Sequence, residues 1–221
     1  MRSFRIGKLI AVEGMDGSGK STTVSYITDQ LNQRGQKAIC TREVGGTPIA
    51  EELRNLAFKT RPDEKIDPLA RLLMVYASRI QHIREILEPN IAKGIHVVTD
   101  RYNDSTRVYQ GVIDGLSESM AHLEACLPLR MVGGCADHTV FIDVDPEVAF
   151  SRGIARANVD NDVYKNKLDM AKKIADAYRK LLETRKRTVS SSVFVIDGNK
   201  PLDHVKYQLN DFIDYIVTNR Y

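Results

Sequence analysis

Short apolar runs alternate with longer amphipathic stretches along this chain. The runs at 8–13, 37–41, 95–99, 139–144 and 193–196 are predicted to be strands, because they are brief and bounded by polar or turn residues. The stretches at 20–33, 49–58, 67–87, 105–111, 146–156, 165–186 and 202–217 are predicted to be helices. This alternation favours an α/β fold, a doubly wound five-stranded parallel sheet with helices on both faces. No repeat or linker divides the chain, so 1–221 is predicted to be a single domain.

The long helix predicted at 67–87 carries one apolar face with an arginine beside it. That face consists of Leu69, Leu72, Leu73, Tyr76, Ile80 and Ile83. Arg79 falls roughly 60° from the centre of this face, and Val75 lies about 40° further round. An arginine in such a place either pairs with a buried partner or lays its stem on the core and reaches solvent.

Composition is typical of a compact enzyme of the cytoplasm and excludes several other classes. The net charge of +3 is too small to indicate a nucleic-acid partner. The three cysteines form no CxxC pair, and the five histidines lack metal-ligand spacing. No apolar run approaches membrane-spanning length, and the first residues lack a signal-peptide core. We therefore expect neither a membrane nor a nucleic acid as partner.

Residues 14–21, directly after the first predicted strand, match the pattern G-x-x-x-x-G-K-[S/T]. Glycines let the backbone N–H groups surround a phosphate chain, and the following helix points its positive end at the same place. A lysine in the seventh position reaches the β- and γ-phosphates, and the next hydroxyl binds Mg²⁺. The candidate ATP-binding residues are Gly14, Asp16, Gly17, Ser18, Gly19, Lys20, Ser21 and Thr22. A glycine-rich turn that fits by chance is the alternative.

Charged residues also follow two other predicted strands. Arg42 comes after the strand at 37–41, and Asp100 and Arg101 come after the strand at 95–99. Loops at the carboxyl ends of parallel strands line the ligand crevice, so these arginines are placed to meet anions. Asp100 is placed like a strand-end aspartate that holds Mg²⁺, with Ser21 as the other candidate metal ligand. Each residue alone could instead serve a surface ion pair or a helix cap.

Six segments taken together resemble the thymidylate kinase family of P-loop nucleoside monophosphate kinases. They are 13–22, 41–48, 76–79, 100–102, 109–111 and 141–147. The resemblance implies phosphoryl transfer from ATP to dTMP, giving ADP and dTDP for dTTP synthesis, with Mg²⁺ as cofactor. It also implies a homodimer, to which the long helix at 67–87 would contribute.

The resemblance further implies a role for each matching residue. Lys20 and Ser21 would serve the ATP phosphates and the metal, and Asp100 would support the metal. Asp16 would face the acceptor sugar, and Arg42 and Arg101 would clamp the acceptor phosphate. The remaining substrate-binding candidates, near the base and the sugar, are Arg79, Ser105, Thr106, Tyr109 and Gln110.

Two departures from the family pattern bear on function. Val75 stands where the family usually has a phenylalanine that stacks on thymine, a contact worth on the order of 1 kcal/mol. Looser base recognition follows as a hypothesis, so a broader deoxynucleoside monophosphate kinase is the alternative enzyme. The predicted lid, about 151–165, lacks the family's arginine after its aspartate. Arg156 is our candidate for the transferred phosphate, Arg152 is the other, and a solvated ion pair is the alternative. A regulatory nucleotide-binding protein with reduced catalysis remains a third reading.

Overall fold

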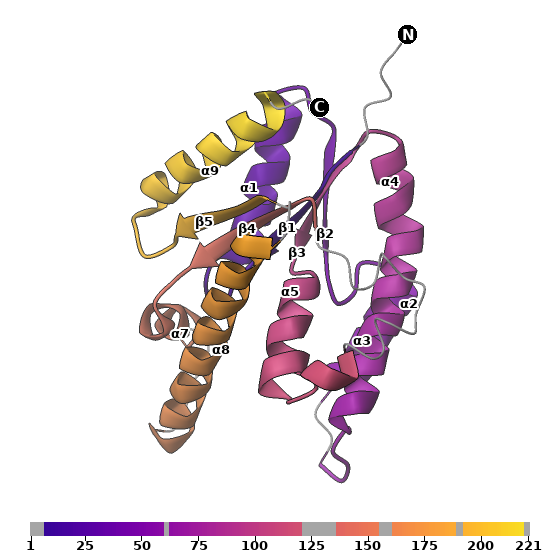
Figure 1. The fold of residues 1–221 in the computed structure, drawn as a ribbon, viewed down its shortest axis with the longest axis vertical. Coiled ribbons are helices and arrows are strands. Elements are labelled where there is room, and N and C mark those ends of the chain that lie inside the picture. Colours follow the sequence, from indigo (N-terminus) through magenta and orange to yellow (C-terminus); the bar gives the residue numbers. More distant parts are fainter. Residues whose placement is uncertain (1–6, 60–61, 121–135, 155–160, 189–191, 219–221) are drawn as a thin grey trace.

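The computed structural model describes residues 7–59, 62–120, 136–154, 161–188 and 192–218. Five parallel strands form one sheet in the order β2-β3-β1-β4-β5. The strands are β1 (Leu9–Glu13), β2 (Ala38–Arg42), β3 (His96–Asp100), β4 (His138–Asp143) and β5 (Ser192–Asp197). The predicted five-stranded parallel α/β fold is therefore confirmed (Figure 1).

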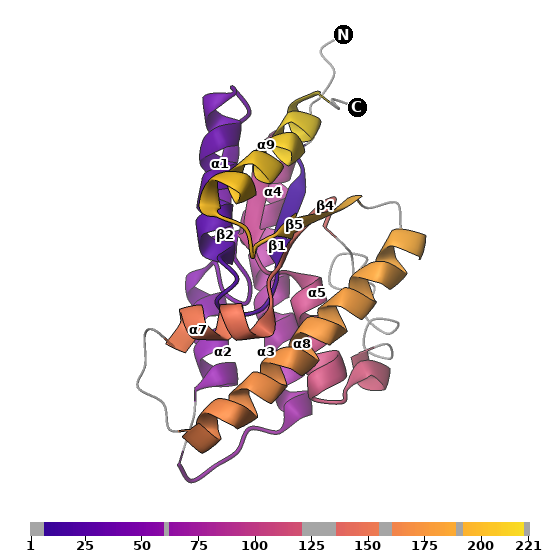
Figure 2. The ribbon, with the colours of Figure 1, turned by 90° about the vertical axis from the view of Figure 1, so that its left-hand side faces the viewer.

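The helices connect the strands and cover both faces of the sheet (Figures 1 and 2). The first part of the chain contains α1 (Lys20–Gln33), α2 (Pro48–Phe58), α3 (Pro68–His82) and α4 (Glu88–Ala92). The second part contains α5 (Asn103–Thr106), α7 (Pro146–Ile154), α8 (Asn161–Thr188) and α9 (Leu202–Thr218). Two π-helical turns, η1 (Ile83–Leu87) and η2 (Arg107–Ile113), continue α3 and α5. None of the helices in the described ranges is long and apolar enough to span a bilayer.

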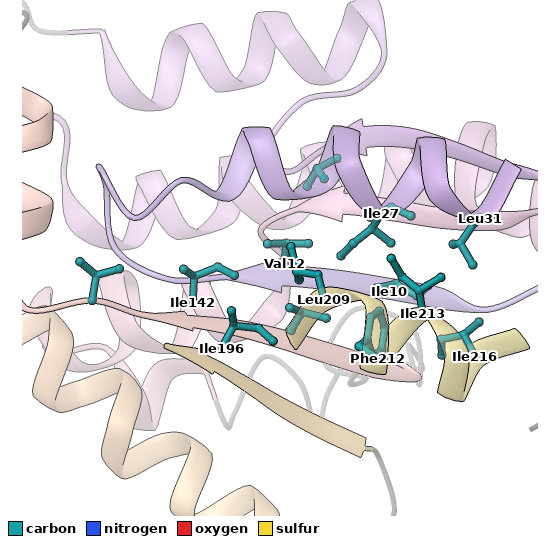
Figure 3. Close-up of a cluster of buried hydrophobic side chains, with 14 of the residues drawn as sticks. Ile10, Val12, Ile27, Leu31, Ile142, Ile196, Leu209, Phe212, Ile213 and Ile216 are labelled. Carbon is teal, nitrogen blue, oxygen red and sulfur yellow. The ribbon is translucent and has the colours of Figure 1, made fainter. Parts of the chain in front are cut away.

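Alternate residues of the central strand face two separate cores, because successive side chains of a strand point to opposite faces. Ile10 and Val12 pack with side chains of α1 and α9 (Figure 3). Leu9 and Ala11 pack on the other face with Ile83 and neighbouring side chains. Both faces of β1 are buried, as a parallel sheet requires. The carboxyl ends of the strands, from which the loops predicted to bind ligands begin, are thereby held between two layers of helices.

The predicted end of the long helix was wrong. Instead of stopping before Pro89, the helical path passes through η1 and continues in α4. The N–H of Glu88 bonds to the carbonyl of Ile83, five residues back, which widens the turn. Pro89 then lies in the first turn of α4, and because proline has no N–H to donate, the widened turn falls where a regular helical hydrogen bond is lost.

The predicted buried face of this helix was wrong in part. Leu72 and Tyr76 are buried, but Leu69 and Leu73 are 42% and 48% exposed. The buried face of the helix is therefore rotated from the predicted one toward Arg79. Arg79 is fully buried, whereas the prediction placed it at the edge of the buried face. The polar partners of Arg79, described below, hold the helix in this rotation.

Candidate active site

The loop between β1 and α1 has the backbone of a phosphate cradle. Gly17 and Gly19 take φ values of 82° and 93°, a region that favours glycine. A Cβ at Gly17 would lie 2.0 Å from the carbonyl oxygen of Ala149 in α7. A larger residue is therefore excluded at position 17.

Lys20 begins α1 and is almost completely buried. Its Nζ donates a hydrogen bond of 2.7 Å to the carbonyl oxygen of Met15 and lies 3.8 Å from Asp16 Oδ1. Burial lowers the pKa of Lys20 to about 8, and the nearby Arg101 cation acts in the same direction. The ammonium group is thus held inside the loop, where an anionic phosphate would favour its charged form.

Ser21 and Asp100 meet although 79 residues separate them. The Ser21 hydroxyl donates a hydrogen bond of 2.7 Å to Asp100 Oδ2. The register of the sheet causes this meeting, because Val12, the residue before the end of β1, pairs with Asp100 at the end of β3. A hydroxyl and a carboxylate are oxygen ligands of the kind that Mg²⁺ prefers, with phosphates and waters completing its shell. The two residues therefore fit the metal that the sequence predicts. Within the described ranges, no three His, Cys, Asp or Glu side chains gather as a metal site.

Arg42 ends β2 and is held in place by an acidic side chain of α2. Its Nε and Nη2 donate to the two carboxylate oxygens of Glu51, at 2.9 and 2.5 Å. The Arg42 side chain remains 56% exposed, so this bidentate pair is open to exchange with an anionic ligand. Another arginine, Arg54, comes from α2 and donates to the carbonyl of Val44 at 2.7 Å.

Arg101 follows β3 with a positive φ of 71°. Its Nη2 donates to Asp16 Oδ1 at 2.5 Å, and its guanidinium carbon lies 5.1 Å from the ring centre of Tyr109. The other terminal nitrogen, Nη1, bonds inward to Ser105 Oγ at 3.0 Å. The arginine thus bridges the phosphate loop and the buried residues beneath it.

These residues surround a cleft of about 700 Å³ at the carboxyl edge of the sheet. Its lining consists of Asp16, Gly17, Gly19, Lys20, Ser21, Thr22, Arg42, Glu43, Arg54, Asp100, Arg101 and Arg152. Five cationic side chains therefore converge on one cleft together with the candidate metal ligands. Such an arrangement can bind two phosphate groups and neutralise charge between them.

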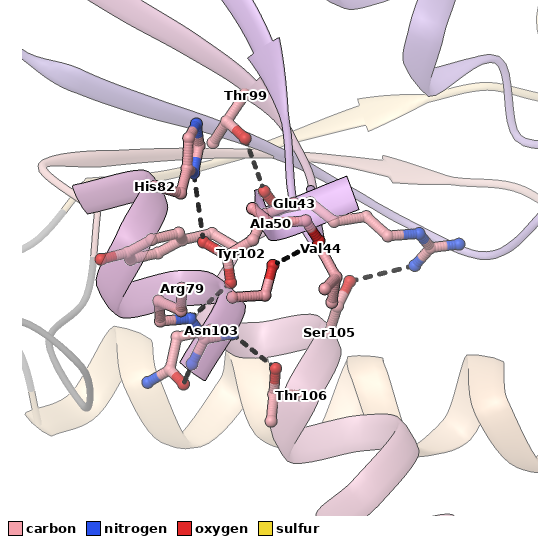
Figure 4. A network of polar contacts seen from close by, with 12 residues as sticks. Glu43, Val44, Ala50, Arg79, His82, Thr99, Tyr102, Asn103, Ser105 and Thr106 are labelled. Carbon is pink, nitrogen blue, oxygen red and sulfur yellow. Dashed lines mark hydrogen bonds and ion pairs between the residues drawn. The ribbon is translucent and has the colours of Figure 1, made fainter. Parts of the chain in front are cut away.

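The residues predicted to contact the base and sugar form a separate buried cluster. Arg79 forms an ion pair with Glu43 and donates to Asn103 Oδ1 at 2.8 Å and to Thr106 Oγ1 at 2.6 Å. Figure 4 shows Arg79 beside Asn103 and Thr106, with Glu43 on its other side. The rings of Tyr76 and Tyr102 lie within 6 Å of the guanidinium carbon. Of the two interpretations of Arg79, the buried pairing is therefore the correct one.

Other predicted substrate residues also lie outside the lining of the cleft. Val75 is fully buried, and Gln110 is nearly so. The Ser105 hydroxyl donates to Glu13 Oε2 at 2.6 Å, and Tyr109 packs edge-on against Tyr178 at 6.4 Å between ring centres. Direct contact of these side chains with a nucleotide stays a prediction.

The predicted lid is described only in part. Arg156 lies outside the described residues, so its candidate role stays a prediction. Arg152, the other candidate, is exposed and donates to the carbonyl of Gly198 at 3.1 Å. Arg152 lines the cleft, and α7, which carries it, contacts the phosphate loop through Ala149.

Sequence reasoning missed three residues around the cleft. Glu13 is fully buried, and burial raises its pKa to about 7, with the nearby Asp104 acting in the same direction. Tyr178 reaches the site from α8, and Arg54 from α2. A glutamate ending an otherwise apolar strand was a readable signal for the first, because buried carboxylates require partners. The other two carried no motif.

A phosphate-binding backbone loop and converging cations at the carboxyl edge of a parallel sheet define a P-loop phosphotransferase. The family profile described as Thymidylate kinase matches residues 12–209, and the chain belongs to the thymidylate kinase family. A protein of Francisella tularensis subsp. novicida named Thymidylate kinase is 35% identical over 208 residues, which cover 94% of this chain and 95% of the relative. Another of that name from Hahella chejuensis is 34% identical over 200 residues, covering 90% and 92% respectively.

Proposed function

We propose that this protein catalyses ATP-dependent phosphorylation of dTMP to dTDP. The meeting of a phosphate loop and four arginines at one cleft is the observation that carries the proposal, since transfer between two nucleotides needs two phosphate sites side by side. Family membership over nearly the whole chain supports the same reaction.

ATP phosphates are assigned to the loop backbone and Lys20, and the acceptor phosphate to Arg42 and Arg101. The exposed Arg42–Glu51 pair supports this, because a phosphate can replace the carboxylate at the same guanidinium fork. Asp16 is assigned to the acceptor sugar. Its hydrogen bond from Arg101 ties the phosphate loop to the arginine of the acceptor site. Base recognition is assigned to Arg79, Thr106 and Gln110, flanked by Val75, with Ser105 and Tyr109 near the sugar.

Ser21 and Asp100 would hold Mg²⁺ at the edge of the ATP site. When bound there, the metal supplies charge neutralisation between the phosphates. For the transferred phosphate, we retain Arg156 as the candidate from the lid near 151–165, with Arg152 as the second candidate. We also propose that residues 1–221 fold as one domain, which the continuous sheet from β1 to β5 supports.

The first test is ADP release from Mg-ATP with dTMP, dUMP, dCMP or dGMP as separate acceptors. We expect rapid turnover with dTMP. Lys20→Met should abolish it, whereas Lys37→Met, which alters an exposed lysine after α1, should match the unaltered protein. ATP binding without turnover on any acceptor would contradict the proposal and favour the regulatory reading.

A broader acceptor range is the second candidate function, and Val75 is the observation in its favour. An aliphatic side chain at this position supplies no aromatic stack, so less binding energy distinguishes thymine from other pyrimidines. Comparable turnover of dTMP, dUMP and dCMP would support it. A strong preference for dTMP alone would exclude it.

We also propose a homodimer, assembled through α2 and α3. These helices expose apolar side chains that are unusual on a surface: Ile49, Leu56, Phe58, Leu69 and Leu73. Ile49 and Leu56 are seven residues apart and share one face of α2. Light scattering after size exclusion should give twice the chain mass, and Leu56→Glu should halve it. A monomer at assay concentrations would contradict the assignment.

A further inference from the structure

Glu13, the last residue of β1, is a fully buried carboxylate that four donors surround. The backbone N–H groups of Tyr102 and Ser105 donate to its Oε1 at 2.8 and 3.2 Å. The hydroxyl groups of Ser105 and Tyr178 donate to its Oε2 at 2.6 and 3.1 Å. Both carboxylate oxygens are therefore satisfied by groups from α5 and α8.

The same two hydroxyls also receive hydrogen bonds from Arg101. Its Nη1 lies 3.0 Å from Ser105 Oγ and 3.1 Å from Tyr178 Oη. A hydroxyl has one hydrogen and two lone pairs, and an ionised carboxylate can only accept. The two hydroxyl oxygens also lie 2.7 Å apart, so one of the two hydrogens is shared between Glu13 and the other hydroxyl. Because a guanidinium can only donate, both hydroxyl oxygens turn a lone pair toward Arg101.

We infer that Glu13 and Tyr178 are positioning residues that hold Arg101 in the geometry needed at the acceptor phosphate. The inference rests on the proposed function, in which Arg101 clamps that phosphate. Nη1 is anchored inward by the two hydroxyls, and Nη2 faces Asp16 and the cleft. A guanidinium is planar and rigid, so fixing one terminal nitrogen aims the other.

Tyr178 is itself held firmly, which lets it act as a fixed support. Its ring stacks on Phe141 of β4 with 5.5 Å between the ring centres. Two helical turns further along α8, Arg185 forms a buried ion pair with Asp104 and donates to Thr139 Oγ1 at 3.1 Å. Tyr178 thus links the well-anchored helix α8 to Arg101.

Tyr178→Phe tests the inference, because it removes one hydroxyl and leaves the stacked ring in place. A lost hydrogen bond to a charged group should raise the KM for dTMP about 5- to 20-fold. The KM for ATP should stay within about twofold, since the phosphate loop is untouched, and the Tm should change by only a few degrees. Tyr26→Phe is the matched control: its hydroxyl bonds to Asn210 on the α9 side of α1, and its kinetics should be unchanged.

A double-mutant cycle with Arg101→Lys separates positioning from other roles. If Tyr178 acts through Arg101, then Tyr178→Phe should add little to the KM for dTMP in the Arg101→Lys background. An unchanged KM in the single variant, or a full further increase in the double variant, would overturn the inference. If Arg101→Lys alone left dTMP kinetics unchanged, the assignment of Arg101 in the proposed function would fail instead.

Discussion

Removing the arginine of the buried cluster beneath the cleft should destabilise the fold strongly. The Arg79 side chain has no exposed surface, and the Glu43 side chain is only 1% exposed. Arg79→Met keeps the length of the side chain and removes its charge and donors. Glu43 then stays buried without its counter-charge, with His82 Nδ1 still 4.0 Å from its Oε2.

The size of the loss follows from the burial of this pair. Removing one partner of a buried ion pair costs about 3–5 kcal/mol, because the other charge is left uncompensated. Thr106 and Asn103 also lose hydrogen bonds from Arg79, so we expect the loss of stability to lie near the upper end of this range. In a chain of this length each kcal/mol lowers the Tm by about 2–4 °C, so a fall of about 10 °C or more is expected.

Urea unfolding followed by circular dichroism measures the loss directly. Arg79→Met with Glu43→Gln should recover much of the stability lost in the single variant, since no buried charge is then left unpaired. Arg84→Met, which breaks the exposed pair with Glu88 on one helix face, is the control and should cost less than about 1 kcal/mol. A loss below about 1 kcal/mol for Arg79→Met, or no recovery in the double variant, would refute the reasoning.

Three further predictions concern the phosphate loop and its surroundings. Gly17→Ala should unfold at a lower urea concentration and bind ATP more weakly, because its Cβ would meet the Ala149 carbonyl. Gly115→Ala is the control, since Gly115 has a φ of 75° but open space around it. This variant should lose only about 1–2 kcal/mol of unfolding free energy and keep its affinity for ATP. Equal effects in the two variants would show that the clash is absent. Ser21→Ala should raise the Mg²⁺ concentration for half-maximal turnover by about tenfold or more, measured by magnesium titration at saturating nucleotides; an unchanged titration would remove Ser21 as a ligand. Burial raises the pKa of Glu13 from 4.5 to about 7. Between these two pH values the native state binds more protons than the unfolded state, so the free energy of unfolding falls as the pH rises through this range. Urea unfolding at pH 5 and 8 should show Glu13→Gln losing less stability with rising pH than the unaltered protein, and parallel curves would contradict the assignment.

The fold was largely predictable because its pattern is local. Strands buried on both faces form short apolar runs, and the five observed strands lie within about one residue of the predicted ones. The phosphate loop was predictable for the same reason, since all its groups lie within one short segment. The position of Asp100 beside Ser21 followed from parallel topology, because the carboxyl ends of adjacent strands share one edge.

The ends and rotation of the long helix were not predictable from local pattern. Periodicity gives the angles between side chains on a helix, but not which face the rest of the protein covers. The sequence favoured a face that includes Leu69 and Leu73, yet both are exposed. Arg79 lies at the buried centre because Glu43, Asn103 and Thr106 offer partners there, and these come from other parts of the chain.

The sequence by itself therefore determined the class of fold, the phosphate loop and the side of the sheet on which ligands bind. The tertiary structure alone decided which distant side chains support that site. Tyr178 meets Glu13 across 165 positions of sequence, and Arg185 meets Asp104 across 81. Short-range patterns record backbone preferences and hydrophobic periods, whereas such pairs form only when helices pack on a finished sheet, so no local signal could reveal them.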